Sequence, residues 1–293
     1  MNRWVWPGLI LLSILWGGAY LIIEIALKSY SPVLVVLGRV TLAALFLLPF
    51  ALRHGVLSAL KKQPGWVLLT VMMQATLPML LLTFGQHWLS ASLAGIIIGA
   101  QPLFVALLAL KFDPAERPQG VRGLIGLLIG FTGLTLLFGI DLSGGARALL
   151  GGLMLVGAAL SYACGALLIH RKLTFAEPLG IATAAMSIST VVLLIPGLLS
   201  LPNTAPSLPS SIALLTLGIV FTGVTLTLNY SLIAHAGPAR ATLAFYLSPG
   251  VTVVLSWLLL GEQISWSTGL GLVAIVTGSA LAANRVRVSA RIS

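Results

Sequence analysis

The sequence predicts an all-α membrane protein with ten transmembrane helices arranged as two inverted five-helix repeats. Three observations support this prediction: the composition, a series of apolar stretches and an internal repeat. Of the 293 residues, 58% are hydrophobic and only 8% are charged, whereas a soluble domain carries about 25% charged residues. Because so few charges cannot cover a globule of this size in water, lipid must cover most of the surface.

Ten apolar stretches are each long enough to cross a bilayer, which takes about 20 residues. The apolar runs are continuous and not alternating, which excludes a transmembrane barrel. No long polar insert separates them, so no soluble domain is expected. The predicted spans are residues 7–27, 32–52, 66–86, 92–110, 121–140, 149–169, 178–199, 211–234, 241–259 and 267–284.

A pattern in the fourth predicted span recurs in the ninth. Pro102 is followed by an apolar run and then Glu116, and Pro249 by an apolar run and then Glu262. The proline precedes the acid by 14 residues in one copy and 13 in the other, and the copies lie 147 residues apart. A duplicated unit in so apolar a chain is typical of transporters built from structural repeats.

The two predicted repeats, residues 1–143 and 144–293, have opposite orientations in the membrane. Each contains five helices, and because five is odd the second repeat enters from the other side. With both termini in the cytoplasm, thirteen lysines and arginines fall inside and only Lys28 and Arg147 fall outside. This bias predicts cytoplasmic termini. It also accounts for the net charge of +10 without a nucleic-acid partner.

Small residues recur every four positions in several predicted spans. Examples are Gly126 with Gly130, and Ala274 with Gly278 and Ala282. In lipid, such ridges let helix backbones approach closely. The pattern therefore predicts a packed bundle.

The chain resembles the drug/metabolite transporter superfamily, in its ten-helix EamA-like branch, over nearly its whole length. The residues that carry the resemblance are Trp16-Gly17, Ser31-Pro32 with Arg39, Gln101-Pro102, Ser248-Pro249 and Gly261-Glu262. In the first half, Ala115-Glu116 stands where the second has Gly261-Glu262, so the two loops depart from exact symmetry. The resemblance implies a secondary transporter, frequently an exporter of amino acids or related metabolites, and is nearest in kind to aromatic amino acid exporters.

Pro102 and Pro249 fall near the centres of their helices. A proline there removes a backbone donor, so the carbonyls of Ile98 and Phe245 should lose their usual partners. Within a membrane such carbonyls are tolerated only where they face protein or a wet cavity. We therefore expect either hinges that line a central cavity or simple packing kinks.

Glu24 and Arg39 are the charges deepest in the predicted membrane. An unpaired charge in a span costs at least about 2.5–3.5 kcal/mol, and a short loop joins the two helices. We therefore expect a buried Glu24–Arg39 pair. The functional alternatives are that Glu24 takes up a proton, or that Arg39 meets a substrate carboxylate.

Aromatic and amide side chains share the middle of the predicted membrane. Trp16 is the tryptophan at that depth, and Tyr162 falls at nearly the same place in the second repeat. Together with uncharged hydrogen-bonding groups they have the composition of a small-molecule site, although helix packing would explain each aromatic alone. The candidate substrate-binding residues are Trp16, Tyr20, Gln74, Gln101, Tyr162, Asn229, Tyr230, Tyr246 and Ser248.

Several other chemistries are not expected. The four histidines lack metal-ligand spacing, and the single cysteine, Cys164, allows no disulfide within the chain. No phosphate-binding loop is present, so ATP is not expected to drive the protein. No arrangement of nucleophile and base or of paired carboxylates indicates an enzyme. We expect no cofactor and no metal.

The sequence thus favours a secondary transporter of the bacterial inner membrane that moves small neutral or zwitterionic solutes, amino acids among them. Because at most one basic residue lies deep in the predicted membrane, the cavity is poorly suited to multiply charged anions. A monomer can suffice, because one chain holds both repeats. Three alternatives remain: a proton-coupled multidrug exporter, a lipid-linked metabolite flippase and a non-transporting membrane subunit.

Overall fold

The computed structural model describes residues 5–112, 117–137, 145–236 and 243–282. Helices make up the secondary structure of this part, without a strand. Eight helices have the length and apolarity to span a membrane, and two further apolar helices are shorter. The predicted fold class is confirmed. The predicted boundary between residues 143 and 144, and Glu116, lie outside the described residues.

The first five crossings belong to the first repeat. They are α1 (Val5–Leu27), α2 (Pro32–Arg53), the third crossing built from α3 (Pro64–Val71), η2 (Met72–Thr76) and α4 (Leu77–Gln86), the fourth built from α5 (Ala91–Ile98) and α6 (Gln101–Phe112), and α7 (Gly120–Leu136). A short 3-10 turn, η1 (Ser58–Lys62), precedes α3.

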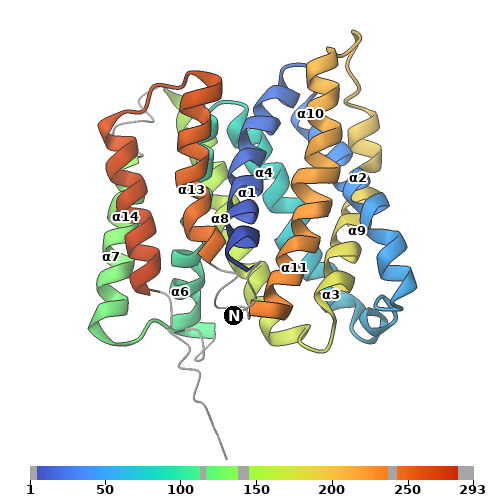
Figure 1. The fold of residues 1–293 in the computed structure, drawn as a ribbon, viewed down its shortest axis with the longest axis horizontal. Helices are drawn as coiled ribbons and strands as arrows, with labels where there is room; N and C mark the ends of the chain where they lie inside the picture. Colours follow the sequence, from blue (N-terminus) through green and yellow to red (C-terminus); the bar gives the residue numbers. More distant parts are fainter. Residues whose placement is uncertain (1–4, 113–116, 138–144, 237–242, 283–293) are drawn as a thin grey trace, which may run out of the picture.

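The second repeat supplies the other five crossings. They are α8 (Ala146–Lys172), α9 (Pro178–Leu198), the eighth crossing built from α10 (Leu208–Gly218), η5 (Ile219–Val224) and α11 (Thr225–Ala236), the ninth built from α13 (Leu243–Leu255) and η6 (Ser256–Leu260), and α14 (Trp266–Ala282). The start of α1 and the turn between α2 and α3 lie toward one end of the bundle (Figure 1). We call this the basic end, because Arg53, Lys61 and Lys62 lie there, and the other end the far end.

Serines start three of the helices that enter from the far end, α2, α5 and α10. The Ser31 hydroxyl accepts a hydrogen bond from the N–H of Leu34 at 3.2 Å, and Pro32 occupies the first turn of α2. Ser90 caps α5 and Ser207 caps α10 in the same way. Each cap gives a partner to a backbone N–H that the helix itself leaves unpaired.

Helix packing follows an exchange of the two repeats. The second crossing, α2, packs on the seventh, α9, and the fifth, α7, packs along the tenth, α14. The first crossing packs on the ninth (α1 on α13) as the sixth packs on the fourth (α8 on α6). This pattern is the one expected when the halves are related by a twofold axis in the membrane plane.

Glycines form the contact between α7 and α14, the pair beside each other at one side of the bundle (Figure 1). A Cβ atom added to Gly126 would lie 2.7 Å from the carbonyl oxygen of Gly278. A Cβ atom on Gly133 would lie 3.1 Å from the carbonyl oxygen of Gly271. The small-residue ridges predicted from the sequence therefore let these two backbones touch.

Three crossings of the described part contain a π-helical segment where the sequence predicts continuous helix; one of them, η6, ends the ninth crossing, and the other two lie mid-crossing. η2 lies in the middle of the third crossing, and η5 in the middle of the eighth, its counterpart in the other repeat. Such segments are rare and are frequent at functional sites. The matched positions of η2 and η5 therefore make the middle of the bundle a candidate functional region.

The glycine contact predicts that Gly278→Ala destabilises the fold. The new methyl group would lie 2.6 Å from the carbonyl oxygen of Gly126, and overpacking of this kind costs about 1–3 kcal/mol. The expected result is a lower melting temperature of the purified protein in detergent. Gly269→Ala on the same helix is the control, because nothing lies within 4 Å of a Cβ atom there. Equal melting temperatures for the two variants would contradict the prediction.

Candidate functional site

Arg39 lies within the bundle on α2 and reaches across to the second repeat. Its Nε donates a hydrogen bond to Oγ1 of Thr222 at 2.8 Å. The Thr222 hydroxyl in turn donates to the carbonyl oxygen of Leu217 at 2.8 Å. Because Thr222 belongs to the π segment η5, the irregular backbone supplies the group that orients the guanidinium.

Two tyrosines interact electrostatically with this cation. They are Tyr20 on α1 and Tyr162 on α8, which also interact with each other. Both are half-buried. We call Tyr20, Arg39, Tyr162 and Thr222 the Arg39 cluster. It draws two residues from each repeat and therefore lies where the repeats meet.

The expected ion pair between Glu24 and Arg39 is not formed. Within the described part of the chain, no carboxylate lies at ion-pair distance from Arg39, and Oε2 of Glu24 is buried without a hydrogen-bond partner. The reason is geometric. Glu24 lies one helical turn nearer the far end than Tyr20, beside Glu262 and the backbone of Ala91. A coupling role of either charge stays a prediction.

An aromatic contact lies on the basic side of the cluster. The rings of Trp16 and Phe245 have centroids 4.2 Å apart and planes inclined at 36°. Trp16, Tyr20 and Glu24 follow one another at four-residue intervals on α1, so they lie along one face of that helix. That face thus carries an apolar wall, a phenol and a carboxylate in succession, about 6 Å apart along the axis.

Gln74 lies in the other π segment, η2, and faces α8. A Cβ atom on Gly165 would collide with the Gln74 side chain, so this glycine lets the two helices meet. Pro78 has no N–H to offer the preceding turn, and the Ser161 hydroxyl donates to the freed carbonyl oxygen of Met73 at 2.9 Å. Oε1 of Gln74 is buried without a partner, which leaves an acceptor in the interior.

The two predicted hinge prolines meet at one crossing. The fourth crossing breaks after Ile98, and Pro102 begins α6 at its second position, where the missing N–H is no loss. Pro249 lies inside the continuous α13 and packs on Gly99 in that break. The break is observed, whereas a hinge motion stays a prediction.

Ser248 has a packing position instead of an open one. It is buried, and a Cβ atom on Gly17 would lie 2.8 Å from its carbonyl oxygen. Oγ1 of Thr252 donates to that same oxygen at 3.0 Å and to the Gly17 carbonyl at 3.1 Å. These contacts hold α1 against α13 at the level of Trp16.

The remaining candidates are not joined to the Arg39 cluster by hydrogen bonds. Gln101, Asn229 and Tyr246 are half-buried on α6, α11 and α13. The side chain of Tyr230 lies outside the described part of the chain, and its role stays a prediction. Within the described residues, no group of three or more His, Cys, Asp or Glu is placed to hold a metal ion.

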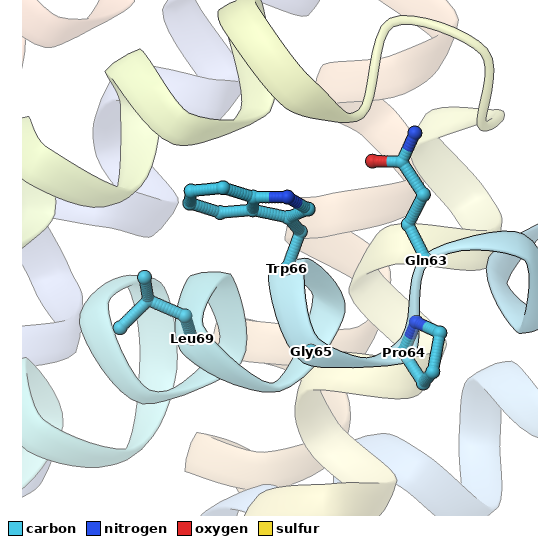
Figure 2. Close-up of a pocket in the computed structure, with 5 residues that line it drawn as sticks. All are labelled: Gln63, Pro64, Gly65, Trp66 and Leu69. Atoms are coloured by element: carbon cyan, nitrogen blue, oxygen red, sulfur yellow. The ribbon is translucent and has the colours of Figure 1, made fainter.

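Two cavities lie at the ends of the bundle. One, of about 430 Å³, opens at the start of α3 and is lined by Gln63, Pro64, Gly65, Trp66 and Leu69. Figure 2 shows the side chains of Gln63 and Trp66 on the same side of the helix start, and Nζ of Lys172 lies 4.6 Å from the Trp66 ring centroid. The other, of about 260 Å³, lies at the far end beside Glu262. Neither cavity is lined by a residue of the Arg39 cluster.

Two contacts of the site were not predicted from the sequence. Thr222 is one of several threonines in an apolar helix, and Phe245 precedes the predicted Tyr246. Nothing in the sequence distinguishes Thr222, because its importance comes from the π segment. The four-residue spacing of Trp16, Tyr20 and Glu24 is, by contrast, a signal that the sequence carries for their shared helix face.

Chemically, the Arg39 cluster offers a cation with no acidic partner in the described part of the chain, two phenols and an aromatic wall. A guanidinium in a fixed position is well suited to a carboxylate, which it binds through two parallel hydrogen bonds. The aromatic contact of Trp16 and Phe245 offers apolar surface nearby.

Comparisons with known proteins agree with this architecture. The model of the EamA-like transporter family matches residues 4–139 and again residues 149–284. The uncharacterized transporter YdfC of Bacillus subtilis is 28% identical over 272 residues, covering 90% of this chain and 86% of its own length. The uncharacterized inner membrane transporter YedA of Escherichia coli K12 is 27% identical over 286 residues, covering 92% and 87%.

A solved crystal structure shares the fold. It matches with a TM-score of 0.68 at 19% sequence identity, covering 96% of this chain and 98% of its own.

The Arg39–Thr222 hydrogen bond predicts that Thr222→Val lowers the stability of the protein. The variant leaves Nε of a charged side chain without its partner, and hydrogen bonds to charged groups contribute about 1.5–3 kcal/mol. The measurement is the melting temperature in detergent. Thr216→Val is the matched control, because that hydroxyl bonds only to carbonyls of its own helix. A Thr222→Val protein as stable as the control would show that this bond does not hold Arg39.

Proposed function

Because the chain belongs to the EamA-like transporter family, whose relatives here include an inner membrane transporter, we propose that it carries amino acids or similar zwitterionic metabolites. Transport across the bacterial inner membrane proceeds by alternating access, and export is the expected direction. One chain holds both repeats, so a monomer suffices.

The observation that carries this proposal is the state of Arg39. It lies among tyrosines inside the bundle, and no carboxylate of the described part of the chain pairs with it. A charge held in a membrane interior is costly and is retained where it serves a substrate or ion. The α-carboxylate of an amino acid is the simplest ligand that supplies the missing charge.

The aromatic wall sets the preference among amino acids. Trp16 and Phe245 lie on α1 and α13, one turn or more toward the basic end from Tyr20. A carboxylate at Arg39 directs the substrate side chain toward these rings. Bulky apolar and aromatic side chains bury the most area there and should bind best.

The positions of the two cavities are consistent with alternating access. Neither end cavity is lined by a residue of the Arg39 cluster, and in the proposed cycle helices separate at one end to admit the solute. The paired packing of the two repeats supplies two equivalent interfaces to separate. Exchanging their conformations would open the opposite end.

The charge distribution supports a cytoplasmic position of the basic end. The described lysines and arginines there are Arg53, Lys61, Lys62, Lys111, Arg117, Arg122, Arg171 and Lys172, whereas Lys28 and Arg147 lie at the far end. An excess of this kind marks the cytoplasmic side.

The central test is Arg39→Gln. The protein is reconstituted into liposomes preloaded with unlabelled leucine or phenylalanine, and uptake of the labelled amino acid is measured. Losing the charged hydrogen bonds should lower the apparent affinity by about tenfold or more. Amino acid amides, which lack the carboxylate, should not compete with the labelled substrate in the unchanged protein.

Arg53→Gln is the control for this test, because that arginine ends α2 at the exposed basic end. It should leave uptake unchanged. Full exchange by a folded Arg39→Gln protein, or strong competition by the amides, would contradict the carboxylate site.

Pro249→Ala tests the crossing at the break of the fourth helix. Alanine restores the backbone donor and removes the ring that packs on Gly99, so the exchange rate should fall while the melting temperature holds or rises. Pro196→Ala is the control, since that proline is exposed inside α9. Unchanged exchange by Pro249→Ala would remove the hinge role.

A further inference from the structure

Carboxylates from the two repeats converge on the start of α5 at the far end. Glu262 accepts from the N–H of Ala91 through Oε1 at 2.9 Å and from the N–H of Ser92 through Oε2 at 3.2 Å. The Glu24 carboxylate lies close enough to interact electrostatically with the Ala91 N–H and with Glu262. Two carboxylates thus face one backbone donor, which is bonded to Glu262.

Local backbone geometry places Glu262 there. Gly261 ends η6 in the left-handed conformation, with φ of 68°, which favours glycine because it has no Cβ atom. The chain then turns back, and the N–H of Glu262 bonds to the carbonyl oxygen of Ser256 at 3.3 Å. The Gly261-Glu262 pair of the sequence is therefore what brings this carboxylate onto the first repeat.

Polar groups near this place lack partners. Oε2 of Glu24 and Oε1 of Gln86 are buried acceptors without partners, and the Ser92 hydroxyl, which can donate or accept, is also unpartnered. Gln86 is 3% exposed and Ser92 is 4% exposed. Nε2 of Gln86 donates to the carbonyl oxygen of Tyr20 at 2.5 Å, which fixes the amide on α1 one turn from Glu24. Ser92 and Glu262 line the same cavity of about 260 Å³.

Little positive charge balances the two carboxylates. Lys28, which follows α1, is the base that acts electrostatically on Glu24, and it is exposed. The elements α4, α5, α10 and η5 that pack on α1 contain no titratable side chain. The titratable groups with described side chains on the other neighbours are Arg39 and Arg53 on α2, Tyr246 on α13 and His235 on α11, and none of them is among the groups that act electrostatically on Glu24.

We propose that the far end holds a binding site for one monovalent cation, a proton or Na⁺, between Glu24 and Glu262. The buried acceptors of Gln86 and Ser92 complete the site. Occupancy neutralises one of the two like charges and keeps Glu262 on the start of α5. Loss of the cation restores the repulsion between the carboxylates and separates the repeats at this end.

The site goes beyond the Arg39 cluster, because it links opening of the far end to a cation gradient and not to the solute alone. It joins α1 and α5 of the first repeat to the turn after η6 of the second. Any solute that enters or leaves at this end must pass while the link is broken.

The test is cysteine labelling of the purified protein, with no transported solute present. Cys164 is first replaced by alanine, and Leu93, which lines the cavity, is replaced by cysteine. Reaction with a bulky polar maleimide is compared with that of the same cysteine in a Glu24→Gln protein, which removes the effect of pH on the thiol. The labelling rate of the parent divided by that of the Glu24→Gln protein should rise about fivefold or more between about pH 5 and about pH 8 without Na⁺.

The cation is identified by a second arm at the higher pH. Protection by added Na⁺, but not by choline, assigns Na⁺, whereas no protection by Na⁺ assigns the proton. Glu262→Ala should label rapidly at every pH, because the bonds from the second repeat to the N–H groups of Ala91 and Ser92 are then lost. Glu177→Gln, an exposed acid at the start of α9, is the matched control and should respond like the parent.

A ratio that changes with neither pH nor Na⁺ would overturn the proposal, and so would a Glu177→Gln protein that loses the response. Glu24→Gln is the single acid variant that must fold for this ratio to be measured. Because no amino acid is present in the labelling experiment, a negative labelling result leaves the Arg39 proposal intact. A negative result in the amino acid exchange experiment likewise leaves the cation-site proposal intact.

Discussion

In lipid, every backbone polar group must find its partner inside the protein, and this constraint organises the structure from the helices to the site. Where the backbone is regular, the helix meets the requirement by itself. Where it is irregular, a side-chain hydroxyl supplies the partner, either from another helix or from the same crossing. Ser161 serves the carbonyl of Met73 beside the π segment of the third crossing, and Thr222 serves Leu217 in that of the eighth. Because the Thr222 hydroxyl can also accept, it becomes the group that orients Arg39.

Among the described residues, the side-chain hydrogen bonds between different helices mostly join one repeat to the other. Arg39 bonds to Thr222, Ser161 to Met73, Thr252 to Gly17 and Glu262 to Ala91. Apolar helices pack against one another with little preference for register in a lipid environment, because lipid tails are as apolar as their side chains. Directional bonds of this kind therefore fix how the halves sit, while small residues permit the close approach.

The sequence predicted the crossings and their order well, because length and apolarity alone mark a helix in a membrane. Its small-residue spacing predicted close backbone approach in a packed bundle, and the contact of α7 with α14 is an example, although the sequence did not identify that pair. The Glu24–Arg39 pair was wrong, because closeness of two charges along the chain does not fix the directions of their side chains. Thr222 and the landing place of Glu262 could not be predicted, since they depend on π segments and on contacts between residues about 170–180 positions apart.

The glycine contact between α7 and α14 also couples the substitutions that the two halves of the chain can tolerate. Each helix is the counterpart of the other, so Gly126 and Gly133 in one half face Gly271 and Gly278 in the other across a backbone-to-backbone contact. Neither half can acquire a larger side chain there unless its counterpart yields space. A hybrid protein, with one half from this chain and one from a distant relative, would assemble only if both donors kept small residues at this seam.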